Sequence, residues 1–225
     1  MDNAVVANVF GTLGAVLWSL QLLPQIWKNW RRHDSKGLSS AFFLSWAIAG
    51  VPLGVYNIAD AFNVALQIQP NILILLSLCT WCQCKYYGEK WPLSKAALCS
   101  TAIAAVLAGA EVGLVFALRV ARDRGQDWAS ILMAIIAAVL LAGGVLRHYI
   151  DMYRTRSDAG ISLKFAVLDL SGDIASLVSV IFQPTLKIYG LVIYGTELAI
   201  WIGLVFIVIY FRLIARNGAL QESGT

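Results

Sequence analysis

Long apolar stretches separated by short polar or basic segments make up almost the whole chain. A helix needs about 20 mainly apolar residues to cross the hydrocarbon core of a bilayer. Polar side chains (Gln67 and Gln69) and Pro70 interrupt the start of the third stretch, which makes it the weakest. The pattern predicts an all-α membrane protein with seven transmembrane helices, at roughly 8–29, 40–60, 67–85, 96–118, 128–149, 163–183 and 188–211.

Composition supports this prediction. Hydrophobic residues make up 59% of the 225 residues, charged residues 13%, and the mean hydropathy is +0.72. Soluble domains carry roughly 25% charged residues. The first stretch is too long for a cleaved signal peptide, and Asp2 stands where such a peptide carries positive charge.

The distribution of Lys and Arg predicts the orientation, because cytosolic loops are enriched in both. With a lumenal or external N-terminus, 13 of the 17 basic residues fall on the cytosolic side. The other four are Arg119, Arg122, Arg124 and Lys187. We therefore expect a lumenal N-terminus and a cytosolic C-terminus, and the net charge of +4 requires no nucleic-acid partner.

The chain also shows an internal repeat at an offset of 123 residues. The matched pairs are Leu23 with Leu146, Arg31 with Arg154, Gly37 with Gly160, Ser39 with Ser162, and Phe42 with Phe165. The repeat predicts two three-helix units, 1–90 and 125–216, joined by a linker helix within 91–124 and followed by a short tail, 217–225. Because one helix separates the units, they run in the same direction across the membrane and form parallel repeats (3+1+3).

Two local motifs accompany the repeat. Gly37 precedes Ser39, which we expect to cap the following helix, and the same pattern recurs at Gly160 and Ser162. Pro24 lies inside the first span, where it removes a hydrogen bond from the helix and predicts either a hinge or a static kink. Gln25 can then satisfy the freed carbonyl or contact a substrate.

These motifs resemble the PQ-loop family, which includes cystinosin, the lysosomal and vacuolar exporters of cationic amino acids and, more distantly, the SWEET sugar transporters and the KDEL receptor. The resemblance covers nearly the whole chain. Its densest segments are Leu23-Pro24-Gln25, Asn29-Trp30-Arg31-Arg32, Gly37-Leu38-Ser39, Tyr56-Asn57-Ile58, Gly160-Ile161-Ser162 and Leu168-Asp169-Leu170-Ser171-Gly172. It implies seven spans and small-molecule transport.

The sequence departs from the family pattern at two places. Arg147 and His148 replace the second Pro-Gln pair, which removes one of two expected hinges. Trp46 stands opposite Asp169 in the repeat, where the family commonly carries a polar residue. Either change points to a different substrate or to a member that does not transport.

Four carboxyl groups lie within the predicted spans. A charge at mid-bilayer costs roughly 2.5–3.5 kcal/mol on insertion scales, so such residues indicate function. Asp169 and Asp173 share one helix face, being four residues apart. The resemblance implies that Asp169 carries the coupled proton, since burial favours the uncharged form of a carboxyl group. The alternative is a packing role. We assign Glu197 and Asp173 relay or hydrogen-bonding roles, and Glu111 a packing role.

Further polar and aromatic residues are expected along the substrate path. Gln21 lies one turn before Gln25, and Asn57 lies near the far end of the second span. Trp46 and Tyr194 are candidate aromatic walls, although aromatic side chains in spans also serve as interface anchors.

Metal and catalytic sites are not expected. Cys79, Cys82 and Cys84 cluster, but zinc requires a fourth ligand and neither His33 nor His148 is obviously near. No phosphate-binding loop, zinc-protease helix or nucleophile elbow occurs. We expect no cofactor and no enzyme activity.

The sequence therefore predicts a proton-coupled transporter that moves a small amino acid, or a related solute, from an acidic organelle to the cytosol. By family analogy that organelle is the vacuole or lysosome. A SWEET-like sugar facilitator and a non-transporting receptor or scaffold are the alternatives.

Overall fold

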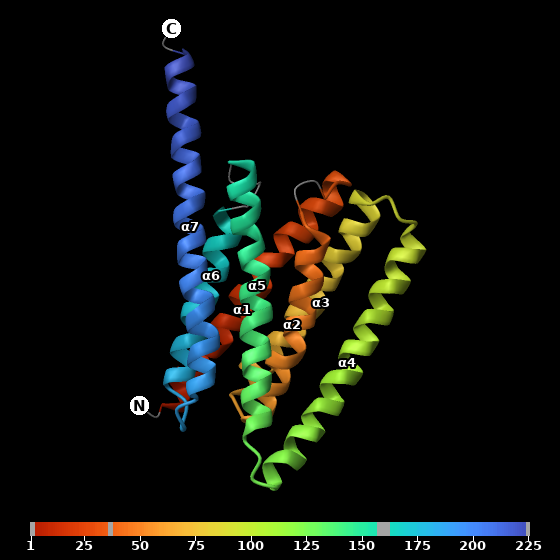
Figure 1. The fold of residues 1–225 in the computed structure, drawn as a ribbon, viewed down its shortest axis with the longest axis vertical. Helices are drawn as coiled ribbons and strands as arrows, with labels where there is room; N and C mark the ends of the chain where they lie inside the picture. Colours follow the sequence, from red (N-terminus) through yellow and green to blue (C-terminus); the bar gives the residue numbers. More distant parts are fainter. Residues whose placement is uncertain (1–2, 36–37, 157–162, 224–225) are drawn as a thin grey trace.

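The computed structural model describes residues 3–35, 38–156 and 163–223, and every regular element in these ranges is a helix (Figure 1). The element bounds are α1 (Ala4–Arg32), α2 (Ser40–Ala59), α3 (Val64–Gln83), α4 (Leu93–Asp123), α5 (Trp128–Thr155), α6 (Leu163–Ile181) and α7 (Ile188–Ser223), with a π-helical turn, η1 (Cys84–Gly88), after α3. The predicted all-α fold of seven helices is confirmed.

Side-chain caps fix where three of the helices begin. Asn3 accepts a hydrogen bond from the backbone N–H of Val6, and Ser39 accepts one from Phe42. The predicted cap at Ser39 is therefore confirmed. Its counterpart in the second unit, Gly160 with Ser162, lies outside the described residues, as does Gly37.

The third helix begins earlier than the apolar run indicates. Asn63 caps it, so helix α3 starts at Val64 rather than at residue 67. Gln67 donates to the carbonyl of Phe62, and the buried Gln69 donates to Ser176 Oγ at 3.3 Å. These bonds occupy the NH2 groups of both amides and let a polar segment continue the helix, although Gln69 Oε1 has no partner among the described residues.

The helices form two units of three with the same internal order. In the first unit, α3 packs against both α1 and α2; in the second, α7 packs against both α5 and α6. Two contacts join the units, α1 with α6 and α2 with α5. Exchanging α1, α2 and α3 for α5, α6 and α7 leaves this pattern unchanged, as expected for parallel repeats.

The linker helix α4 lies on the outside of the first unit (Figure 1), where it contacts α2 and α3 and only slightly α5. Six helices in the described part of the chain are long and apolar enough to cross a membrane. The exception is α6, which carries Lys164, Asp169 and Asp173 among its 19 residues. It packs between α1 and α7, inside the bundle.

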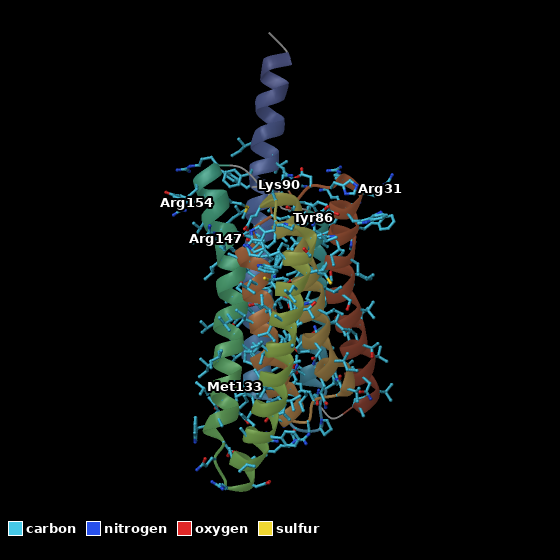
Figure 2. All side chains as sticks on the ribbon, turned by 90° about the vertical axis from the view of Figure 1, so that its right-hand side faces the viewer. Arg31, Tyr86, Lys90, Met133, Arg147 and Arg154 are labelled. Atoms are coloured by element: carbon cyan, nitrogen blue, oxygen red, sulfur yellow. The ribbon has the colours of Figure 1, made fainter. Side chains whose placement is uncertain are left out.

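The two ends of the bundle differ in charge. The C-terminal ends of α1, α3 and α5 lie at the upper end in Figure 1, and the N-terminal end of α1 lies at the lower end. In Figure 2 the labelled basic side chains Arg31, Lys90, Arg147 and Arg154 gather at the upper end. At this end Glu89 lies outside the spans, and its hydrogen bond from Lys85 lowers the pKa of the Glu89 carboxyl.

Candidate functional site

Three carboxyl groups meet in the interior between the two units. Asp169 and Asp173 project from α6 and Glu197 from α7, and each is at most 2% exposed. They are close enough for their charges to interact. The ion pairs that Glu89 forms with Lys85, and Asp60 with Arg122 and Lys187, do not involve these three acids. We call Asp169, Asp173 and Glu197 the carboxyl cluster.

The cluster opens onto a narrow enclosed space of about 180 Å³ at the centre of the bundle. Its walls come from both units, and the gaps between them are too narrow for a water-sized sphere. The lining residues are Trp18, Gln21, Trp46, Leu73, Leu141, Asp169 and Glu197. The structure is therefore closed around the cluster, and a solute reaches it only if the two units move apart.

Several polar atoms in this space are buried without a hydrogen bond to any described residue. They include both amide atoms of Gln21 and the indole nitrogens of Trp18, Trp46 and Trp201. Gln21 and Trp201 lie beside Asp169, and Trp18 lies beside Asp173, but not in good hydrogen-bonding geometry. Unsatisfied polar groups are costly in a dry interior and cluster at functional sites.

Two glycines let tryptophans from the first unit approach helices of the second. A Cβ atom at Gly172 of α6 would lie 2.2 Å from Cδ1 of Trp18, and one at Gly144 of α5 would lie 2.7 Å from the Trp46 ring. Real Cβ contacts are essentially never this short. The α1–α6 and α2–α5 contacts therefore each include a tryptophan packed on a glycine.

Aromatic rings close the site toward the upper end. Trp201 packs against Phe165 and Trp46, with ring centroids 5.6 and 6.3 Å away. Phe42 continues this cluster, 4.5 Å from Trp46 and 4.4 Å from the half-buried ring of His148. His148, one of the residues that replace the second Pro-Gln pair, therefore lies in an aromatic contact at the edge of the upper closure.

Toward the lower end, Tyr194 links the site to α1 and α2. Its ring lies 6.0 Å from that of Trp18, and its hydroxyl accepts a hydrogen bond of 3.3 Å from Asn57. Asn57 also donates to the backbone of Leu66, which ties α2 to the start of α3. Both residues are fully buried, so their predicted place inside the bundle agrees with the structure.

Polar contacts seal the lower end itself. Asn63 donates to Ser179 Oγ at 2.7 Å and to the carbonyl of Ala7 at 3.0 Å, which joins α1 to α6. Asp60, which follows α2, forms ion pairs with Arg122 of α4 and with Lys187, 3.7 Å away, before α7. These bonds must break if this end opens.

Pro24 and Gln25 lie apart from the carboxyl cluster. Pro24 is exposed on the surface of α1, and Gln25 is half-buried. Gln25 donates to Asn29 Oδ1 at 2.7 Å, Asn29 donates to Gln83 at 3.0 Å, and Gln83 donates to the carbonyl of Ile26. The Gln25 amide was predicted either to bond the carbonyl that Pro24 leaves free or to contact a substrate, and the structure shows neither role. Instead, this chain of amides ties α1 to α3.

We expect Asn29→Ala to lower the free energy of unfolding by about 1–3 kcal/mol, because Gln25 and Gln83 would each lose a partner. Thermal unfolding in detergent measures the change. The exposed neighbour Lys28 supplies the control, since Lys28→Ala removes no described hydrogen bond. Equal melting temperatures for the two variants would contradict the structural role of the amide chain.

Glu111 lies outside the central site, as expected. It projects from α4 toward Gly54 of α2 and accepts a hydrogen bond of 3.1 Å from Asn71 of α3. It therefore helps to attach the linker helix to the first unit. No group of three or more His, Cys, Asp or Glu side chains placed to hold a metal ion occurs among the described residues.

The sequence analysis missed two residues of the site, Trp18 and Trp201. Trp18 precedes Gln21 by three positions and Trp201 follows Glu197 by four, so each shares a helix face with a buried polar residue. This spacing was a usable signal. It is weak for tryptophan, because the same residue anchors spans at the membrane interface.

The fold and the site define a class: a multi-pass helical membrane protein built of two three-helix units around a buried acidic interior. A family model described as the PQ loop repeat matches residues 6–66. The chain is 36% identical over 215 residues to an uncharacterized protein of Schizosaccharomyces pombe, covering 96% of this chain and 76% of the relative. It is 31% identical over 230 residues to an uncharacterized membrane protein of Saccharomyces cerevisiae, covering 100% and 74%. The chain belongs to the PQ-loop family.

Proposed function

We propose that this protein is a proton-coupled transporter that carries a small amino acid, or a related solute bearing an amino group, from an acidic organelle to the cytosol. The observation that carries the proposal is the carboxyl cluster, enclosed between two units and without a basic partner among the described residues. The proposal assigns no catalytic step to the chain.

The energetics of charge connect this cluster to protons. An unpaired ionised carboxylate in a dry interior costs several kcal/mol, so the closed form is favoured when its charge is neutralised. Asp169 is the proposed carrier of the coupled proton. The titratable groups close to it are Asp173 on the same helix and Glu197 on α7, and Tyr194 of α7 lies close to Asp173.

The geometry supports alternating access. The carboxyl cluster lies between an aromatic closure at one end and polar seals at the other, and the two units meet mainly through α1–α6 and α2–α5. Rocking of one unit against the other would open either end in turn. The basic upper end would face the cytosol, by the enrichment of Lys and Arg there.

Flux measurements in proteoliposomes test the proposal. We expect uptake of a radiolabelled amino acid or amine to accelerate when the proton gradient runs in the same direction as the solute, and to slow when it is reversed. Acceleration by the opposite gradient would indicate exchange instead of cotransport. Sugar flux independent of any gradient would support a facilitator and overturn the proposal.

A further inference from the structure

The carboxyl cluster and its aromatic neighbours form a site with one sign of charge. Asp169 and Glu197 line the enclosed space and Asp173 lies close to Asp169, and the charged groups that influence these acids are other acids within the cluster. Ion pairs with Lys or Arg in the described part of the chain lie elsewhere. A positively charged solute would find a partner here, whereas a carboxylate would meet repulsion.

The walls add a second, independent feature. Trp18 and Trp46 line the space, and Trp201 lies beside Asp169. All three are at most 5% exposed. A cation over the face of a buried tryptophan is attracted by the ring quadrupole, and aromatic cages of this kind recognise alkylated ammonium groups. Gln21, 2% exposed and with both amide atoms unpartnered among the described residues, also faces the space.

The hydrogen-bond donors of the site are all neutral, being the amide of Gln21 and the indole N–H groups of Trp18, Trp46 and Trp201, and none has a hydrogen-bond partner among the described residues. The indole N–H of Trp18 lies beside Asp173, and that of Trp201 lies beside Asp169. The Trp46 nitrogen packs against α5, 2.7 Å from the position of a Cβ on Gly144. A substrate carboxylate would therefore find neutral donors but no Lys or Arg side chain in an ion pair with the cluster. An amino acid would bury its carboxylate beside the acids of the cluster without a positively charged partner, which is unfavourable.

We propose that the enclosed site binds a small organic cation that carries no carboxylate, such as a diamine or a quaternary ammonium compound. This inference rests on the proposed function, and it narrows the substrate from amino acids to amines. The cation enters when the two units move apart. One carboxylate of the cluster is then ionised to balance a quaternary ammonium group, or two to balance a doubly charged diamine, and the remaining carboxyl groups stay protonated. The site is neutral with the cation bound.

Matched pairs of ligands that differ only by a carboxylate test the proposal in purified protein. Cadaverine is lysine without its carboxylate, and agmatine stands in the same relation to arginine. We expect thermal stabilisation of the protein to reach half its maximum at a concentration at least about tenfold lower for the amines. Equal or tighter binding of lysine and arginine would overturn the proposal.

A variant pair tests the aromatic cage. We expect Trp46→Phe to retain choline binding with a modest loss, because the ring face remains, and Trp46→Leu to lose most of it. The melting temperatures of the ligand-free variants show whether each is folded. If Trp46→Leu is folded and binds choline as well as the unchanged protein, the cage is not used and the proposal fails.

Flux assays with the same ligands separate this inference from the proposed function. Proton-driven flux of lysine with none of cadaverine would leave the transporter intact and overturn the amine specificity. Selective binding of cadaverine without flux of any ligand would support the binding site and count against transport.

Discussion

Asp169→Asn is expected to reduce proton-driven flux by about tenfold or more, equivalent to at least about 1.4 kcal/mol, while the protein remains folded. Asparagine has the shape of the protonated aspartate but cannot release a proton. Because Asp169 is 1% exposed and unpaired with any described basic residue, its neutral mimic should fit the closed interior. Proteoliposome uptake with and without a pH gradient gives the measurement.

Glu89→Gln provides the matched control for this prediction. Glu89 is an acid outside the spans, where it pairs with Lys85 at 2.7 Å. Losing one exposed ion pair changes stability by at most about 1 kcal/mol, and the gradient dependence of flux should be unaffected. If both variants transport like the unchanged protein, the carboxyl at Asp169 carries no coupled proton. If Asp169→Asn fails to fold, the premise of a neutral carboxyl in the closed form is wrong.

Gly172→Ala is expected to destabilise the protein by about 1–3 kcal/mol, because the added Cβ overlaps the Trp18 ring and forces an overpacked contact. The overlap is large, with Cδ1 of Trp18 only 2.2 Å from the new atom. Thermal unfolding in detergent gives the magnitude. The displaced ring borders the enclosed space, so ligand binding should weaken as well.

Gly109→Ala in α4 is the control, since nothing lies within 4 Å of a Cβ there. Its effect should stay within about 1 kcal/mol and favour the helix. A double variant makes the test specific: in the Trp18→Leu background, Gly172→Ala should cost less than in the unchanged protein. An equal cost in both backgrounds would show that the contact of Gly172 with Trp18 is not the cause.

The free energy of the closed form contains opposing contributions from its interior and from the polar contacts at its lower end. The interior holds unsatisfied donors and acids, which disfavours closure, while Asn63 with Ser179 and Asp60 with Lys187 favour it. For the proposed transporter, opposing terms of a few kcal/mol would keep an open and a closed form within reach of a ligand or a proton. A binding event that neutralises the cluster would then shift the balance toward closure.

Particular residues show how far the sequence reached into the site. Asp169 and Asp173 stand out because two acids four residues apart in an apolar run have few structural explanations. Gln21, Trp46, Asn57 and Tyr194 were expected in the interior and lie there. The structural role of Gln25 was not predictable. Gln25 donates to Asn29, and Asn29 in turn donates to Gln83, which lies 54 residues further along the chain.

The sequence by itself determined the seven helices, their parallel repeat order and the presence of acids within the spans, because length, apolar content and charge are local properties of the chain. The tertiary structure alone decided that α6 and α7 bring their acids together, and that Trp18 and Trp201 complete the site. The reason lies in the solvent. Lipid and protein interior are both apolar, so hydrophobic periodicity does not tell which face of a membrane helix turns inward.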